Sequence, residues 1–98
     1  SVGEGELIVL DAQGDRLVDR SFGYIWDLHD IRGFEGGSSS VSVGLWSYDG
    51  LQLLPEDYSD IEARESADGQ PQVRTWRTGH EGYEDFLISD LRRAAAGE

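Results

Sequence analysis

Carboxylates are the side chains of this sequence that could do chemistry, and they are densest between residues 56 and 68. On a strand, Asp60 and Glu62 would point the same way about 6.6 Å apart, which is twice the rise per residue. A row of such carboxylates can bind the arginine and lysine side chains that normally hold phosphates. The sequence therefore predicts a partner-binding surface that contains Glu56, Asp57, Asp60, Glu62, Glu65 and Asp68.

The acidic segment has three alternative interpretations. A calcium loop needs oxygens at alternate positions, a central Gly and a terminal Glu, and Tyr58-Ser59-Asp60-Ile61 does not supply them. A carboxylate pair of the glycosidase kind stays open, because any acidic protein offers such pairs. The plainest alternative is an acidic face that only contacts solvent.

The two histidines do not form a recognisable metal site. His29 could combine with Asp27, Asp30 or His80, but none of these combinations has the spacing of a closed ligand set. His80 is better explained as part of the start of a C-terminal helix. The chain has no Cys, which excludes disulfides and thiolate zinc sites. We therefore expect no metal and no cofactor.

The glycine- and serine-rich residues 33–40 resemble a phosphate loop only in composition. They lack a Lys and a following helix, so we do not expect phosphate binding. Ser38, Ser39 and Ser40 lack the G-x-S-x-G context of a catalytic serine. The segment is predicted to be a mobile connection between strands. No catalytic residue can be assigned, and we expect that the chain is not an enzyme.

An exposed aromatic side chain beside carboxylates would make a good anchor for a protein partner, because aromatic residues dominate binding hot spots. We expect Trp46 and Tyr48 to fill this role. The reason is that Val41, Val43 and Leu45 already supply the buried face of the same strand.

Hairpins are expected to position these side chains. Residues 6–22 predict a hairpin that turns near Gly14, and residues 23–37 a strand that leads into a flexible loop. Residues 41–54 predict a second hairpin around Asp49-Gly50, with Pro55 ending its second strand. Residues 55–67 are expected to begin with a helical turn and to continue as a strand from Ile61. Asp68-Gly69 then turns the chain into residues 73–77, which completes a third hairpin.

The C-terminal residues carry the pattern of an amphipathic helix. Thr78 and Glu81 fit a capping box at its start, and Arg92 and Arg93 suit its negative C-terminal end. The apolar stripe has helical spacing and consists of Tyr83, Phe86, Leu87 and Leu91.

Together these elements predict an α+β fold. It consists of an antiparallel β-sheet of about five to six strands built from hairpins, with a C-terminal amphipathic helix packed on one face. At 98 residues the chain is expected to form a single acidic α+β domain, residues 1–98.

The charge balance restricts the class of partner. The chain has eight Arg, no Lys and twenty Asp and Glu, which is a formal charge of −12. Direct nucleic-acid binding needs a cationic face, and anionic membranes attract cations as well, so we expect neither. No apolar run reaches the roughly 20 residues of a membrane span, and no signal peptide is recognisable. The chain starts at Ser1 and lacks Met, so we expect a cloning residue there or a longer precursor.

The preferred hypothesis is a small acidic protein-binding domain that inhibits or neutralises a basic protein, such as a nuclease or a nucleic-acid-binding complex. It would mimic the charge of a nucleic acid, as immunity proteins and phage-encoded inhibitors do, in the cytoplasm of a bacterial or archaeal host. The alternative is a structural or accessory domain whose acidic surface is adapted to high salt. The sequence leaves the oligomeric state open.

Overall fold

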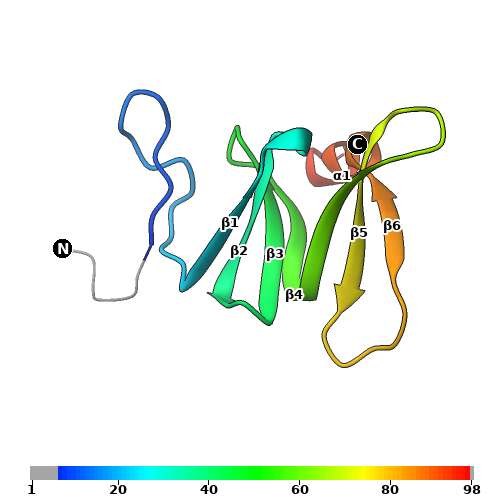
Figure 1. Ribbon diagram of the computed structural model, residues 1–98. Coiled ribbons are helices and arrows are strands. Elements are labelled where there is room, and N and C mark those ends of the chain that lie inside the picture. Colours follow the sequence, from blue (N-terminus) through cyan, green and yellow to red (C-terminus); the bar gives the residue numbers. More distant parts are fainter. Residues whose placement is uncertain (1–6, 98) are drawn as a thin grey trace.

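Six antiparallel strands form one sheet in which each strand pairs with the next one along the chain. The computed structural model describes residues 7–97 (Figure 1). Helix α1 packs against β4, β5 and β6, and this confirms the predicted α+β arrangement of an antiparallel sheet with a C-terminal helix. The elements are β1 (Tyr24–Leu28), η1 (His29–Ile31), β2 (Gly33–Ser39), β3 (Ser42–Ser47), β4 (Gln52–Glu65), β5 (Pro71–Arg77), β6 (Glu84–Leu87) and α1 (Ile88–Ala95).

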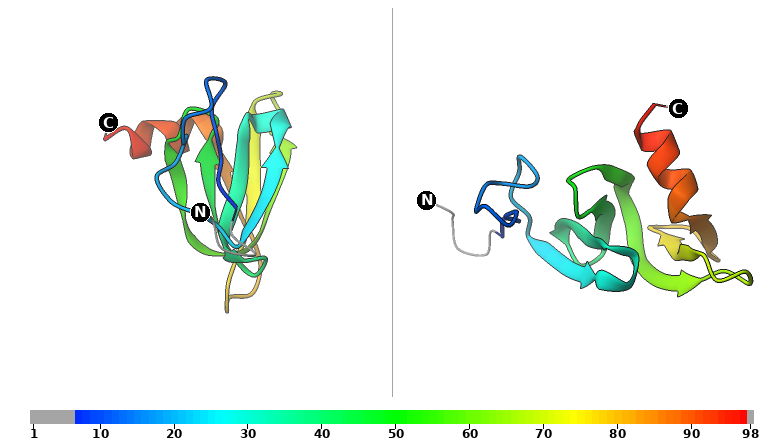
Figure 2. Two further views of the ribbon diagram at one scale, coloured as in Figure 1. Left: turned by 90° about the vertical axis from the view of Figure 1, so that its left-hand side faces the viewer. Right: turned by 90° about the horizontal axis from the view of Figure 1, so that it is seen from above.

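Strand β4 belongs to two parts of the sheet. Its first half pairs with β3 as far as Tyr58, and its second half pairs with β5 from Tyr58 to Glu65. The register shifts on both sides of Tyr58, and bulges of this kind bend a strand and increase its twist. The sheet is therefore strongly curved, as the view from above shows (Figure 2). The short helix η1, which follows β1, contacts β4 and β5 although neither is next to β1 in the sheet.

Apolar side chains pack on both faces of the sheet. The larger cluster includes Val43, Leu45 and Tyr58 from the strands, and Ile88 and Leu91 from α1. On the other face Phe22, Phe34 and Trp46 form a smaller cluster. The ring centroids of Phe22 and Trp46 are 5.0 Å apart in an edge-to-face arrangement, which is favourable for aromatic pairs. Phe22 thus joins the segment before β1 to the sheet.

The glycines that predict a flexible loop lie instead in β2, so the prediction of a mobile connection over residues 33–40 is wrong for residues 33–39. Gly36 faces Phe22, and a Cβ atom at this position would lie 3.0 Å from Phe22 Cδ1. Glycine in a strand often marks such a close approach. The absence of a side chain at Gly36 is what leaves room for the Phe22 ring.

The prediction that Pro55 ends a strand is also wrong. Pro55 lies inside β4, at the register irregularity between the pairs Leu45–Leu54 and Val43–Tyr58. A proline is tolerated at a bulge, because no ladder hydrogen bond is required from its nitrogen there. The helical turn expected from Pro55 is absent, and residues 52–65 are extended throughout.

The second and third hairpins are confirmed. The chain turns at Asp49-Gly50 between β3 and β4 and at Asp68-Gly69 between β4 and β5. Gly50 and Gly69 have φ of 86° and 82°, which glycine adopts at little cost. The first hairpin is confirmed only as a turn with two isolated bridges, Leu7–Phe22 and Leu10–Arg16, because no regular strand forms there. Its expected start, Glu6, lies outside the described residues.

The C-terminal helix is shorter than the capping-box pattern predicts. It begins after Leu87, and residues 84–87 form β6 instead. The Thr78 hydroxyl does not cap a helix but donates to the Val41 carbonyl at 3.1 Å. Arg92 and Arg93 lie in the last turn as expected. No helix within residues 7–97 is long and apolar enough to cross a membrane.

The Phe22 ring should make a large contribution to stability because it is 1% exposed. We predict that Phe22→Ala lowers the free energy of unfolding by about 3–5 kcal/mol, the usual cost of deleting a buried phenyl ring. Urea denaturation measures this difference. Val41→Ala is the control, since Val41 is 62% exposed and its truncation should cost less than about 0.5 kcal/mol. Equal unfolding midpoints for the two variants would contradict the packing described here.

Candidate functional site

The curvature of the sheet leaves two strand edges without partners near each other. Strand β1 pairs only with β2, and the part of β4 beyond Tyr58 pairs only with β5. In this part of β4 the Ile61 N–H donates to a side chain, Asp60 Oδ1, at 2.9 Å.

A groove of about 460 Å³ lies between these elements. Its walls are β1 and η1 on one side and residues 60–63 of β4 on the other, with Glu35 of β2 between them. We call it the carboxylate groove. Its lining contains no arginine, and the only side chain there that can become cationic is His29. The carboxylates that line it are Asp27, Asp30, Glu35, Asp60 and Glu62.

Glu35 is the buried member of this set. Its side chain belongs to the face of the larger apolar cluster, because Glu35 lies opposite Trp26 on β1 and Leu45 on β3 in the strand register. The residue is 5% exposed. Oε1 accepts a hydrogen bond from the Tyr24 hydroxyl at 3.3 Å, whereas Oε2 is buried without a partner. A buried polar atom without a partner costs free energy, and such atoms often mark functional positions.

The surroundings of Glu35 disfavour its charge. Burial is the main cause, and the negative charge of Asp60 adds to it; together they raise the pKa of Glu35 to about 7, against the opposing effect of the Tyr24 hydroxyl and the Ile61 amide. A carboxyl group with this pKa changes charge near neutral pH. The groove therefore carries one negative charge whose presence depends on pH and on what binds beside it.

Aromatic side chains lie next to these carboxylates. Trp26 is 60% exposed, and it lines the groove directly across from Glu35 in the β1–β2 pairing. The Tyr48 hydroxyl donates a hydrogen bond to Asp27 Oδ1, and this bond raises the pKa of Tyr48 to about 12. An exposed indole beside carboxylates is the combination that binds organic cations.

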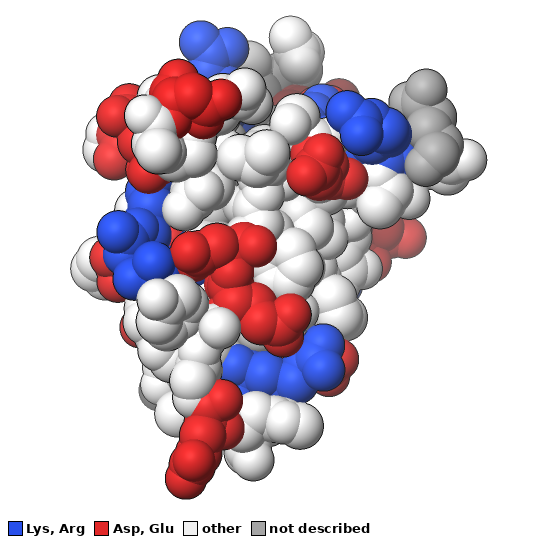
Figure 3. Space-filling model, turned by 90° about the vertical axis from the view of Figure 1, so that its right-hand side faces the viewer, with Lys and Arg blue, Asp and Glu red and all other residues white. Residues whose placement is uncertain are grey.

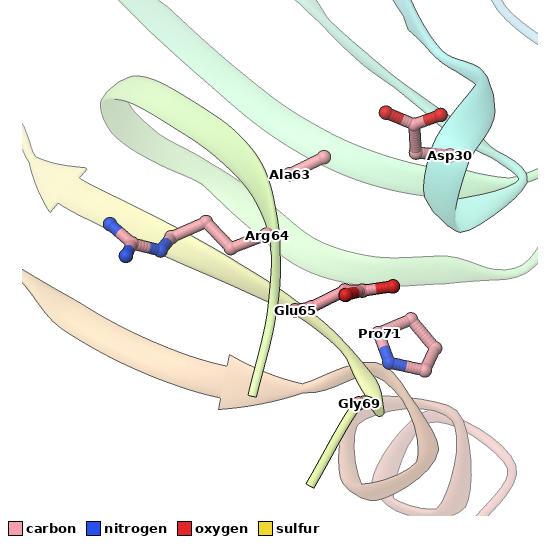
Figure 4. Close-up of a pocket in the computed structure, with 6 residues that line it drawn as sticks. All are labelled: Asp30, Ala63, Arg64, Glu65, Gly69 and Pro71. Carbon is pink, nitrogen blue, oxygen red and sulfur yellow. The ribbon is translucent and has the colours of Figure 1, made fainter. Parts of the chain in front are cut away.

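A second hollow of about 440 Å³ continues from the carboxylate groove and shares Asp30 and Ala63 with it. Asp30 of η1 lies on one side of this hollow, and Glu65 and Pro71 lie on the other (Figure 4). The Arg64 guanidinium points away from Asp30 and Glu65 (Figure 4). The acidic character of the groove therefore extends along β4 as far as Glu65.

Arginines neutralise carboxylates elsewhere on the described surface. Four ion pairs join Arg20 to Glu56, Arg74 to Asp85, Arg92 to Asp49 and Arg93 to Asp90. On the side of the molecule that carries β5 and β6, arginines and carboxylates alternate and no continuous acidic surface forms (Figure 3). The lining of the carboxylate groove differs from this side because it contains no arginine, although Glu62 lies opposite Arg74 in the β4–β5 register.

The structure separates the carboxylates that sequence analysis grouped. Asp60 and Glu62 line the carboxylate groove, and Glu65 lines the adjoining hollow. Glu56 is paired with Arg20, and Glu56 and Asp57 line a different hollow together with Arg77. Asp68 lies in the β4–β5 turn, where hydrogen bonds from Ser66 and Gln70 occupy it and lower its pKa.

The expectation of an exposed Trp46 is wrong, because Trp46 is 3% exposed. It lies on the predicted side of β3, but Phe22 from the N-terminal segment covers that side. The exposed indole is that of Trp26. Tyr48 is 43% exposed and hydrogen-bonded to Asp27, a residue of the groove, but Tyr48 does not itself line the groove.

Sequence analysis missed Glu35 and Tyr24, which are central to the groove. The glycines on either side of Glu35 predicted a loop, and a carboxylate in a loop is expected to be solvated. The usable signal was local: a single acid between Phe34 and Gly36 could belong to a half-buried strand. His29, considered above as a metal ligand, lies 3.2 Å from Asp30 through its Nε2 atom. Within residues 7–97 no three acidic or histidine side chains converge in a way that could hold a metal ion.

Comparison of this chain with protein-family models, curated proteins and solved structures finds no match. The candidate function therefore rests on the geometry and electrostatics of the carboxylate groove.

The raised pKa of Glu35 predicts a specific dependence of stability on pH. Between about pH 4.5 and 7 the folded state holds a proton on Glu35 that the unfolded state has lost, so stability falls as pH rises. Above about pH 7 both states are ionised and the penalty is constant, about 3 kcal/mol. We predict that Glu35→Gln removes this slope and is more stable than wild type at pH 8.

Urea denaturation of both proteins at pH 4.5, 6, 7 and 8 provides the measurement. Taking the difference between the two proteins cancels the general repulsion among the other carboxylates, which both contain. Glu81→Gln, at an exposed position outside the groove, controls for the loss of one glutamate. A difference between wild type and Glu35→Gln that does not change across this pH range would contradict the assigned ionisation.

Proposed function

We propose that this chain is a non-enzymatic acidic binding domain that binds a basic protein through the carboxylate groove. The partner would be a nuclease or another nucleic-acid-binding protein whose cationic side chains normally hold phosphates. Occupying those side chains would block or neutralise the partner, because carboxylates compete with phosphates for arginine and lysine.

The observation that carries this proposal is that five carboxylates line one groove without an arginine among them. Outside the groove, by contrast, four carboxylates form ion pairs with arginines. Leaving like charges together costs folding free energy through mutual repulsion. A cationic partner would remove that cost on binding, and the field of the groove would also speed its association.

Exposed aromatic groups at the groove support a protein partner over a simple ion. Trp26 and Tyr48 offer apolar area next to charge, and aromatic residues of this kind dominate the binding energy of protein interfaces. The unpaired edges of β1 and β4 add backbone groups that can bond to an extended segment of a partner.

A second candidate is a hydrolase that uses Glu35 as its general acid, and the raised pKa of Glu35 favours it. It ranks second because the raised pKa is its main support, whereas the acidic lining and the exposed Trp26 indole of the groove both favour binding of a cation. Hydrolysis of aryl glycosides at pH 6 that is lost in Glu35→Gln would establish this second candidate and overturn the non-enzymatic one.

The binding proposal predicts that groove carboxylates matter more than others of equal charge. The probe is a deca-arginine peptide, and its affinity is measured by calorimetry in low salt. We expect Asp27→Asn/Asp60→Asn/Glu62→Gln to weaken binding by at least about tenfold, from the loss of three negative charges at residues that line the groove. Binding should also weaken as salt is raised, since screening reduces the attraction between exposed charges.

The matched control is Asp15→Asn/Asp19→Asn/Glu81→Gln, which removes the same three charges from exposed positions outside the groove. Equal loss of affinity in both variants would refute a specific site. Melting curves of wild type separate this proposal from the high-salt alternative. A chain that folds only above about 1 M salt, where the Debye length is roughly 3 Å, would favour adaptation to high salt.

A further inference from the structure

The unpartnered oxygen of Glu35 indicates which kind of ligand the groove binds. This inference rests on the function proposed above. Oε2 is buried without a hydrogen-bond partner, and Glu35 lines the carboxylate groove. Its other oxygen already accepts from the Tyr24 hydroxyl. A donor that enters from the groove would therefore complete the hydrogen bonding of Glu35, and a cationic donor would also compensate its charge.

Two other groups face the same space. Asp60 uses Oδ1 to accept from the Ile61 N–H, which leaves its second oxygen for a ligand. Trp26 lies directly opposite Glu35 in the β1–β2 register, and side chains at such paired positions have Cβ atoms about 4.5–5.5 Å apart. The exposed indole and the buried carboxylate are therefore neighbours on one face of the sheet.

We propose that the carboxylate groove receives one arginine side chain of the partner, whose guanidinium binds between Glu35 Oε2 and Asp60 and stacks on Trp26. The guanidinium is planar and carries five N–H donors, so it can bridge two carboxylates and stack on an aromatic face at once. A lysine ammonium has three donors and no flat face, and it would use the groove less fully. A metal ion is the poorer occupant, since no suitable ligand group exists within residues 7–97.

Binding of this arginine should be coupled to the ionisation of Glu35. The titratable groups that surround it are Tyr24 and Asp27 of β1, His29 and Asp30 of η1, and Asp60 and Glu62 of β4; its β3 neighbour, Leu45, has no charge. Only ionised Glu35 pairs fully with a guanidinium. Because the pKa of Glu35 is about 7, Glu35 must lose a proton on binding at any pH below that value. From this linkage the affinity at pH 6 should be roughly tenfold weaker than at pH 8.

The test uses three peptides that differ in one side chain: acetyl-Gly-Arg-Gly-amide and its lysine and citrulline counterparts. Each is titrated into ¹⁵N-labelled full-length protein, and binding is followed by the Trp26 indole and Ile61 amide signals. We expect the arginine peptide to bind at least about fivefold more tightly than the lysine peptide, and the uncharged citrulline peptide to bind far more weakly than either. Glu35→Gln should weaken the arginine peptide by at least about tenfold and remove the pH dependence.

Glu81→Gln is the matched control and should leave the affinity unchanged, because Glu81 lies outside the groove. The pH series is repeated in His29→Gln, since a histidine can also change charge between pH 6 and 8. Equal binding of the arginine and lysine peptides, or no effect of Glu35→Gln, would overturn the arginine site. If deca-arginine still distinguished the two triple variants, that result would leave the proposed function standing. If it did not, both would fall.

Discussion

Strand β4 pairs with β3 along its first half and with β5 along its second half, and this division shapes the whole sheet. A flat meander would give β4 one neighbour on each side along its full length. Here the bulges around Tyr58 turn the strand, so that its second half has a partner on one edge only. The bend brings η1 into contact with β4 and β5, and it leaves a groove between the unpaired edges of β1 and β4.

The position of Glu35 follows from this curvature. On β2 it belongs to the face that packs the larger apolar cluster, yet it lies where the walls of the sheet separate. It is therefore buried enough to lose hydration and close enough to the groove to meet a ligand. The same arrangement puts the exposed Trp26 beside it. A carboxyl group held in this way responds to the charge of whatever enters the groove, which an exposed carboxylate does much less.

Local patterns predicted the fold class well and the site only in part. Turn chemistry located the second and third hairpins, since Asp-Gly pairs need no tertiary information to favour a turn. Residues 33–37 were mistaken for a loop because their glycines serve a long-range contact with Phe22. Burial of Trp46 depends on the same distant segment. Spacing along β4 did bring Asp60, Glu62 and Glu65 to one region, but Glu35 joins them only through the bend of the sheet.

The central claim is that the groove holds a buried carboxyl group that ionises near neutral pH and is stabilised in its charged form by a cation. Its most direct test is a ¹³C NMR titration of the Glu35 side-chain carboxyl, first alone and then with the arginine peptide. The structure predicts a midpoint of about 7 for the free protein and a lower midpoint when the peptide is bound, because a nearby positive charge favours the ionised form. A midpoint near the ordinary value of 4.5 in the free protein, or one that the peptide does not move, would contradict it.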